Sequence, residues 1–440
     1  MKKLPHVSAL KVLLNSKRIL KNPLPFHYEN FEKLGDTFRI SILGEGKVLF
    51  SRDADLVKQV LQKKHRYYSK SKLQTKDLAK YIGYGLLTSE GEHWRAHRRM
   101  IQPAFHVKKL KGLFSIMRNT IVAELERIVP NAEQDVFALM GDLAFQVVAK
   151  SLFSSNDIRE PMSRLQHITE ENQKMLIREM RQPYFKWWYK ASGEIGKHLN
   201  MAETGRNILN DLIEERLSSG KEEHDLLDML LNATYEDGTK MPRRQLIDEV
   251  LILFTAGHET TANALAFTLY FISKDEELQI KLFEEISSLE KDDYTWEDLS
   301  KLSLTTSCIK EAMRLYPPAY FIDRVAIEDN EIDGLHMKKG TLVLLSIFEL
   351  HRHKDFWENP TEYIPDRFMN VDMKEASNYY YPFGAGPRMC VGNAFANYEM
   401  VMVMVEIIKK YHISTKMPRV EINPMISLKP KEVKLNFVLR

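Results

Sequence analysis

The chain has 440 residues, of which 44% are hydrophobic and 28% charged, a balance typical of a folded globular protein and not of a disordered or fibrous one. A formal net charge of +3 gives no strong overall attraction for nucleic acid. Two cysteines are too few for a disulfide framework and favour a reducing compartment, so we expect a cytoplasmic protein.

The N-terminal segment, 1–30, is set apart from a larger domain, 31–440, within which no linker or repeat marks a further boundary. It carries positive charge but no apolar run long enough for a secretory signal peptide. Residues 10–20 could form a short basic amphipathic helix, which either touches a membrane surface or presents a solvated face. We favour the solvated face, the commoner use of such a stretch.

Helical periodicity dominates the rest of the chain. It recurs at 53–63, 92–101, 108–129, 136–153, 161–181, 193–217, 243–272, 275–289, 302–315 and 393–411. Strand-like runs are fewer, at 37–42, 47–50, 323–327, 341–347 and 433–439. Pro317 and Pro318 end the helix before them, because proline lacks the amide donor that a continuing helix needs. The prediction is a mainly α fold with a small β portion.

The most apolar stretch, 250–272, is long enough to span a bilayer, yet His258, Glu259 and Asn263 lie at its middle. A carboxylate at the centre of a membrane helix costs about 3 kcal/mol. We therefore expect a long buried helix and no integral membrane span.

A polar break, residues 256–261, interrupts this helix. Gly257 weakens a helix by roughly 1 kcal/mol relative to alanine, which suggests that the position needs room. Packing of small residues would explain Ala256 and Gly257 but not a buried Glu259. Adjacent Glu259 and Thr260 instead suit a relay for protons and water.

The segment from Phe383 to Gly392 carries the most specific signal. Its glycines allow tight turns and close approach to a flat ligand. A helix is expected to begin just after Cys390, so that its amides and dipole would stabilise a thiolate, and Arg388 adds a cation. Such a thiolate suits axial ligation of haem iron, which favours O–O bond cleavage. A buried core cysteine is the alternative, and it is what we expect of Cys308.

This segment resembles the F-x-x-G-x-R-x-C-x-G haem-binding signature of the cytochrome P450 family, and residues 256–261 resemble its A-G-x-[D/E]-T-T motif. The resemblance covers about 31–440 and implies a single triangular domain that holds haem b (iron protoporphyrin IX), with Cys390 as the iron ligand. It also implies that Thr260 hydrogen-bonds dioxygen and that Glu259 helps to bring protons. The other implied haem contacts are Ala256, Gly257, Phe383 and Gly392.

Further family motifs assign scaffold and propionate residues. Glu311 and Arg314 share a helix face and, with Arg367, resemble the E-x-x-R helix and its downstream arginine segment, although Asp366 replaces the usual glutamate. We assign these three residues to folding around the cysteine loop. The W-x-x-x-R pattern and its analogues imply that the haem propionates contact Trp94, Arg98, Arg324 and Arg388, with Lys70 a weaker candidate.

The other basic residues of 95–111 either dock an acidic electron donor or form a solvated face. A nucleic-acid site is not expected, since no aromatic interleaving accompanies them. His351 and His353 are interpreted as part of a polar turn.

The resemblance implies a haem-thiolate monooxygenase that inserts one oxygen atom of O2 into a C–H bond of a small organic substrate, by hydroxylation or O-dealkylation. Because no fused flavin or iron–sulfur domain is expected, electrons would come from a separate ferredoxin and an NAD(P)H-dependent ferredoxin reductase. Two alternatives stay open: a peroxide-using or isomerising haem-thiolate enzyme, and a non-enzymatic haem sensor.

The substrate pocket is expected to be lined by residues 81–87, 185–188, Phe254, 318–322 and 425–428. Their aromatic and apolar character suits fatty acid, terpenoid, aromatic or methoxylated sugar substrates alike.

Overall fold

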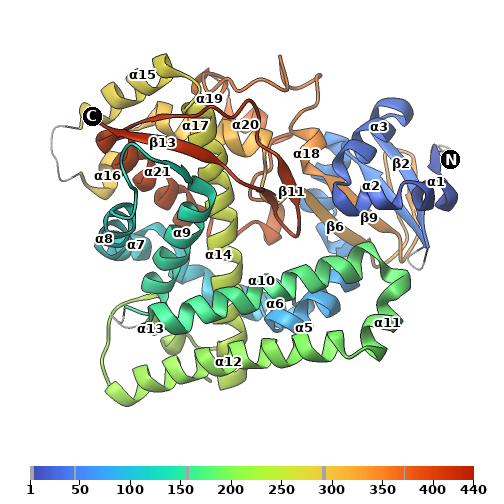
Figure 1. The fold of residues 1–440 in the computed structure, drawn as a ribbon. Helices are drawn as coiled ribbons and strands as arrows, with labels where there is room; N and C mark the ends of the chain where they lie inside the picture. The colour runs from blue at the N-terminus through green and yellow to red at the C-terminus, as the bar shows by residue number, and fades with distance from the viewer. Residues whose placement is uncertain (1–3, 44–45, 155–157, 290–293, 371) are drawn as a thin grey trace.

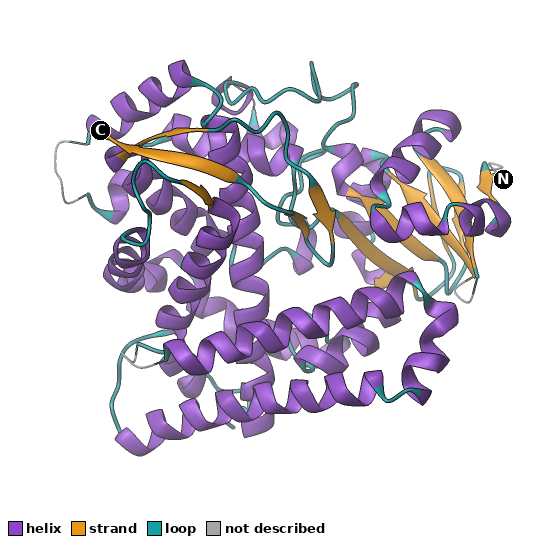
Figure 2. Ribbon diagram, viewed as in Figure 1, coloured by secondary structure: helices purple, strands orange, loops and turns teal. Residues whose placement is uncertain are grey.

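A computed structural model describes residues 4–43, 46–154, 158–289, 294–370 and 372–440 (Figure 1). Most of the chain is helical, and the strands gather mainly on the side of the molecule that carries the N-terminus (Figure 2). The prediction of a mainly α fold with a small β portion is confirmed.

The helices and strands have the following bounds. The helices are α1 (Ala9–Leu14), α2 (Ser16–Lys21), α3 (Leu24–Leu34), α4 (Ala54–Lys58), α5 (Ala79–Ile82), α6 (Gly91–Ile101), α7 (Val107–Leu110), α8 (Phe114–Leu125), α9 (Val136–Leu152), α10 (Arg159–Arg181), α11 (Lys186–Ala191), α12 (Glu194–Ser219), α13 (Leu226–Asn232), α14 (Arg243–Ile272), α15 (Glu276–Ser287), α16 (Trp296–Leu299), α17 (Ser303–Leu315), α18 (Ile347–Leu350), α19 (Arg367–Asn370), α20 (Met373–Ala376) and α21 (Asn393–Lys410). The strands are β1 (His6–Val7), β2 (Thr37–Ile42), β3 (Gly46–Ser51), β4 (Tyr68–Ser69), β5 (Glu133–Asp135), β6 (Phe321–Ala326), β7 (Asn330–Ile332), β8 (Leu335–Met337), β9 (Leu342–Ser346), β10 (Tyr411–Ser414), β11 (Ile422–Pro424), β12 (Leu428–Pro430) and β13 (Lys434–Leu439).

Helix α14 runs through the middle of the molecule (Figure 1) and packs against α9, α12 and α17. Most of its residues are buried, as expected of so apolar a sequence, and they form the main core with α9 and α21. The expectation of a buried helix at 250–272 is confirmed. No helix in the described part of the chain has both the length and the hydropathy of a membrane span.

The larger sheet has the strand order β1-β2-β3-β9-β6-β4. Strands β2 and β3 form an antiparallel hairpin in which Phe38 lies opposite Phe50, and β3 then pairs in parallel with β9. Helix α3 covers the aromatic side of this hairpin, where Phe26 and Phe31 join the buried cluster. Because β1 pairs with β2 in parallel, residues before 30 also belong to the sheet. This sheet and its helices form the second part of the core, beside the helical bundle around α14.

The prediction of one continuous helix at 108–129 is wrong, because the structure divides this segment. Helix α7 ends at Leu110, a 3-10 turn covers Lys111–Leu113, and α8 begins at Phe114. Leu110 and Leu113 are both fully buried, three residues apart, which suits the tighter spacing of a 3-10 turn. Burial of both leucines thus favours a local change of helix type that hydrophobic periodicity does not distinguish.

Candidate functional site

A cavity of about 1310 Å³ brings together segments from the whole chain. Its walls include residues of α1, the β2–β3 hairpin, α6, α10, α14, β6, the loop before α21 and the turn between β11 and β12. The site residues predicted from the sequence that line it are Lys70, Trp94, Arg98, Ala256, Gly257, Thr260, Arg324, Phe383, Arg388, Cys390 and Gly392. Glu259 is not among the lining residues.

Cys390 lies on the cavity wall at the end of a tightly folded loop. Its amide donates a hydrogen bond to the Phe383 carbonyl at 3.0 Å, which closes the loop, and α21 begins three residues later. Burial raises the pKa of the Cys390 thiol, while the Gly392 amide and the Arg98 charge act in the opposite direction. A bound metal cation would complete the stabilisation of the thiolate, so the donor set fits a thiolate-ligated metal.

Gly386 gives this loop its close contact with the rest of the fold. Its φ of +68° lies in the left-handed region, and a Cβ at this position would lie 2.0 Å from the Leu61 carbonyl oxygen. The close approach is therefore to the helical segment before β4 and not to the cavity, which the sequence interpretation did not anticipate. Gly392 has an ordinary negative φ of −87°.

Arg388 and Trp94 form a stacked pair beside the loop. The guanidinium carbon lies 3.6 Å from the centroid of the Trp94 ring, which is a cation–π contact. The guanidinium also donates to the Ser89 carbonyl at 3.0 Å and to the Glu90 carboxylate at 2.6 Å. These contacts fix the orientation of a cation that lines the cavity.

Further cations converge on the same wall with few acidic partners. Arg98 donates to the Met389 carbonyl at 2.8 Å, Arg324 donates to the Asp323 carbonyl at 2.7 Å, and the Lys70 ammonium contacts the Leu87 carbonyl. Burial, together with the charges of Arg388 and Arg324, lowers the pKa of Lys70 to about 7. Because a bound anion would offset the cost of burying these charges, the wall fits a ligand that carries carboxylates.

The polar break of α14 faces the same cavity. Ala256 and Thr260 line it, and the Thr260 hydroxyl donates a hydrogen bond to the Ala256 carbonyl at 2.9 Å, one turn earlier in the helix. A Cβ at Gly257 would lie 3.1 Å from a Val148 methyl, so this glycine gives α9 the room to pack closely. The sequence indicated that position 257 needs room, and the structure shows that close packing of α9 is the reason.

Glu259 points elsewhere and is embedded against β12. Its carboxylate accepts a hydrogen bond from the Ser427 hydroxyl, and the Lys429 ammonium lies 3.8 Å away. Burial raises the pKa of this carboxyl, but Lys429 and Ser427 outweigh it and the net shift is downward. The Glu259 carboxylate is thus ionised, with its charge balanced by Lys429 outside the cavity wall.

The predicted pair of Glu311 and Arg314 is fully buried and joined by Arg367. Two hydrogen bonds of 2.7 and 2.8 Å link Arg314 to Glu311, and Arg367 donates to Glu311 at 3.1 Å. Arg314 also donates to the His351 carbonyl at 2.8 Å, so the network ties α17 to the segment after α18. The expected pairing is confirmed. These charged residues hold the fold together and do not contact a ligand in the cavity, because none of them lines it.

Burial tests the predictions made for His351, His353 and Cys308. His351 and His353 follow α18 in a turn and make polar contacts, as expected, but they are buried, at only 0% and 6% exposed. The ring of His351 accepts the Tyr381 amide at 2.7 Å. Cys308 is fully buried in the main core, as expected.

The expected pocket lining is correct in part. Leu86, Leu87, Met425, Ile426 and all of 318–322 line the cavity. Phe254 does not, because its ring packs in the core against Phe145. Of 185–188 only Lys186 lines the cavity, and the neighbouring aromatic rings are exposed on the surface.

Sequence reasoning also missed residues at the end of the cavity that is formed by α10 and the N-terminal helices. Val12, Leu13, Ser16 and Ile19 contribute apolar and small surfaces there, and Arg181 contributes a cation. The amphipathic spacing at 10–20 was a signal for the helices. No local pattern distinguishes Arg181 from the other basic residues of α10.

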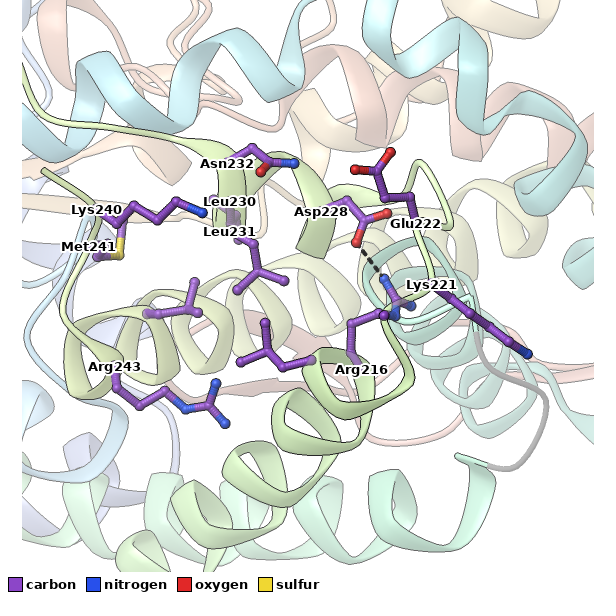
Figure 3. A pocket seen from close by; sticks show the side chains of 13 residues that line it. Arg216, Lys221, Glu222, Asp228, Leu230, Leu231, Asn232, Lys240, Met241 and Arg243 are labelled. Carbon is purple, nitrogen blue, oxygen red and sulfur yellow. Dashed lines mark hydrogen bonds and ion pairs between the residues drawn. The ribbon is translucent and has the colours of Figure 1, made fainter. Parts of the chain in front are cut away.

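A second hollow, of about 360 Å³, lies between α12, α13 and the start of α14 (Figure 3). Its arginines are occupied: Arg216 contacts Asp228 at 2.8 Å and Asp225 at 2.6 Å, and Arg243 contacts Glu214 at 2.8 Å. It shares no predicted site residue with the cavity at Cys390, and we assign it no role.

Comparison with known proteins agrees with this geometry. The family model described as Cytochrome P450 matches residues 5–437. Similar proteins include cytochrome P450 CYP72A613 of Trigonella foenum-graecum, 27% identical over 92% of this chain and 82% of the relative. Human cytochrome P450 4V2 is 29% identical over 79% and 71% of the two chains, and pentalenene oxygenase of Streptomyces avermitilis is 27% identical over 95% and 92%. The chain belongs to the cytochrome P450 family of haem-dependent monooxygenases.

Proposed function

We propose that this monooxygenase binds haem b and that the Cys390 sulfur would hold its iron. The observation that carries the proposal is the position of Cys390 on a cavity wall where the Gly392 amide and the Arg98 charge favour the thiolate. Covalent attachment of a c-type haem would require a C-x-x-C-H sequence, which this chain lacks. Bound haem would supply the activation of dioxygen and the oxidation of the substrate C–H bond.

The cations on the wall would hold the two propionates. Arg98, Arg324 and Arg388 present guanidinium groups that match carboxylates, and Trp94 keeps Arg388 in place. Lys70 would add an ammonium whose pKa rises again once an anion lies beside it.

Small and aromatic side chains would shape the haem faces. Ala256 and Gly257 present little bulk where α14 meets the cavity. Phe383 and Gly392 lie on the same loop as the cysteine sulfur and would shield it from water.

The reaction would convert a substrate R–H, O2, two electrons and two protons into R–OH and water. Thr260 would donate a hydrogen bond from its hydroxyl to dioxygen, for which it must release the Ala256 carbonyl. Glu259 would accept protons at the carboxylate that contacts Ser427 and Lys429 and pass them toward Thr260. Hydroxylation and O-dealkylation both follow from the same insertion.

Electrons would come from a separate ferredoxin and its reductase. Phe105 lies next to Gly392, so the segment after α6 adjoins the cysteine loop. Lys108 and Lys109 are exposed on that segment and provide positive charge for an acidic donor. A cytoplasmic location would suit such a soluble electron donor and stays a prediction.

The carbon monoxide spectrum of the reduced protein tests the proposal. We expect the far-red-shifted band that thiolate ligation gives, and its loss in Cys390→Ser. Cys308→Ser is the matched control, because Cys308 is buried in the core and should leave the band unchanged. A reduced wild-type protein without this band, or a Cys390→Ser variant that keeps it, would refute thiolate ligation by Cys390.

A further inference from the structure

Arg181, the last residue of α10, contributes a cation to the cavity lining, as do apolar residues of the N-terminal helices α1 and α2. Its guanidinium donates to the Leu20 carbonyl of α2 at 2.7 Å and contacts the Pro424 carbonyl of β11. Both acceptors are neutral backbone groups. The Tyr320 hydroxyl also interacts with this guanidinium. A guanidinium has five N–H groups, so these contacts still leave donors free for a ligand.

The charge of Arg181 lacks a counterion. Within the described residues, no carboxylate oxygen forms an ion pair with it at 4.0 Å or less. Two other cavity cations have acidic partners, since Lys186 lies 2.5 Å from Asp77 and Arg388 lies 2.6 Å from Glu90. Arg98 and Arg324 also lack a carboxylate partner among the described residues, but the proposed function already assigns them to the haem propionates. Glu179, an acid on the same helix, is already bound by Lys80 at 2.6 Å.

Apart from charges that are already paired, such as Glu179 with Lys80 and Asp77 with Lys186, the groups around Arg181 are neutral or apolar. His27 is fully enclosed, and burial followed by the charge of Arg181 lowers its pKa to about 3, so the imidazole is neutral. Tyr320 donates its hydroxyl to the Met425 carbonyl at 2.7 Å. Met180 and Ile426 complete an apolar surface around the cation.

A guanidinium in such surroundings favours a carboxylate, because the fork of N–H groups matches the two oxygens and a single negative charge balances it. A phosphate would bring a second negative charge. Among the described residues that line this end of the cavity, the further cation without an acidic partner is Lys72, which is exposed to solvent. From Arg181 to Cys390 the cavity is lined mainly by apolar side chains, which suits a long hydrocarbon body.

We propose that Arg181 binds the carboxylate of a long-chain monocarboxylic acid, whose apolar body extends along the cavity toward Cys390. This assignment rests on the proposed function and names its substrate class. Arg181 acts as a specificity residue at the end of the substrate remote from the C–H bond that is oxidised.

The competing explanation is a tether, in which Arg181 only fastens α10 to α2 and to β11. The two roles differ in one measurable ratio. A tether affects charged and uncharged ligands of equal size alike, whereas a carboxylate site affects only the acid.

The test measures the affinities of hexadecanoic and dodecanoic acids and of their methyl esters for the haem-loaded protein, by calorimetry and by the spin-state change of the haem. A charge-assisted hydrogen bond predicts that each acid binds roughly tenfold to hundredfold more tightly than its ester. In Arg181→Gln the acid-to-ester ratio should fall to about one while ester affinity is kept, and Arg181→Lys should retain part of the preference.

Arg178→Gln is the matched control, because Arg178 is exposed one turn earlier on α10 and does not line the cavity. It should leave the ratio unchanged. Equal affinities for acid and ester in the wild type, no binding of either acid, or equal weakening of both by Arg181→Gln would overturn the assignment. These outcomes are independent of the carbon monoxide band, so a normal band with no acid preference would reject this inference alone.

Discussion

The Thr260 hydroxyl can serve only one acceptor with its single proton. At present that acceptor is the Ala256 carbonyl, one turn earlier in α14 and also exposed to the cavity. Donation to a ligand therefore requires a rotation of the side chain, which a threonine in a helix can make because two of its rotamers are populated. Thr260 thus donates a hydrogen bond within the helix when no ligand is near, and after rotation it can donate the same proton to a ligand in the cavity.

Thr260→Ala should uncouple electron consumption from product formation. Loss of a hydrogen bond to a group that gains negative charge predicts a drop of roughly tenfold or more in product formed per electron pair, with hydrogen peroxide released instead. The measurement is the ratio of product to reductant consumed.

Thr260→Ser and Thr260→Val provide the controls for this experiment. Serine keeps the hydroxyl and should keep most of the coupling, whereas valine keeps the shape and should behave as alanine does. An alanine variant with wild-type product yield would show that the hydroxyl has no part in proton delivery.

Glu349 is a buried carboxyl whose charge Arg352 and Arg52 offset only in part. It is 2% exposed, one carboxyl oxygen has no hydrogen-bond partner among the described residues, and the nearest arginine nitrogen, on Arg52, lies 3.8 Å away. Burial raises its pKa from 4.5 to about 7. The folded protein therefore keeps this proton in a range where the unfolded chain has released it.

The consequence is a pH-dependent loss of stability that Glu349→Gln should remove. Between about pH 4.5 and 7 the unfolded state binds fewer protons at this residue, so its contribution falls as the pH rises, by up to about 3 kcal/mol. Buried His27 and His351, whose pKa values are lowered to about 3, act in the opposite direction, because stability is lost as the pH falls below their unfolded values.

The difference in unfolding free energy between wild type and Glu349→Gln therefore isolates the carboxyl. Chemical unfolding at several pH values should show that the free energy of unfolding of Glu349→Gln rises relative to that of the wild type as the pH rises. A difference that stays constant across this range would mean that Glu349 ionises normally in the folded protein.

At the scale of elements, the cysteine loop depends on its contact with the helical segment at Leu61. Gly386 combines a positive φ with a Cβ position 2.0 Å from backbone oxygen, Gly384 has a positive φ of +71° but only an ordinary contact at 3.7 Å, and Gly392 has neither constraint. Alanine at these three positions therefore separates backbone strain from steric conflict.

We expect Gly386→Ala to lower the thermal midpoint and the haem content most. Gly384→Ala should lose about 1–2 kcal/mol from the left-handed backbone alone, and Gly392→Ala should be close to wild type. Thermal unfolding and the haem-to-protein ratio measure both effects. Equal losses in all three variants would show that the Leu61 contact does not position the loop.

The elements that the sequence predicted well are those whose pattern is local. Helix α14 and the hairpin of β2 and β3 carry strong hydrophobic patterns, and their positions agree with the prediction to within a few residues. The short strand β5 was missed, because its pairing with β13 joins segments far apart in the chain. Strand β10 was missed because it follows α21 directly, without a break in the hydrophobic pattern. The break between α7 and α8 was missed because the buried residues Leu110, Leu113 and Met117 are three and four positions apart, a spacing that a continuous helix also gives.

At the scale of the whole molecule, the predictable part of the site is the part that carries motifs. Cys390, Thr260 and Arg98 could be named because their neighbours in sequence are distinctive. Arg181 could not, since its role depends on which distant segments surround it. The proposed boundary at residue 30 falls within α3, and α1 and α2 contribute to the cavity wall. Burial of His351 likewise follows from tertiary packing alone.

Because the cavity wall draws on segments from Ala9 to Ile426, a ligand within it should stabilise the entire fold. Haem at a hundredfold excess over its dissociation constant would contribute about 2.7 kcal/mol to the folded state, and tighter binding contributes more. The haem-free protein should therefore unfold several degrees lower in a thermal scan. It should also be cut faster by protease near α1 and α2, which then lack a filled cavity to pack against.

Cys390→Ala separates the metal bond from the rest of this effect. With the propionate contacts intact, the variant should show a smaller rise in midpoint on haem addition than the wild type, while Cys308→Ser should show the full rise. If the midpoint of the wild type does not change with haem content, the cavity is held open by the polypeptide alone, and the partly buried cations Lys70 and Arg324 must then be tolerated without a bound anion.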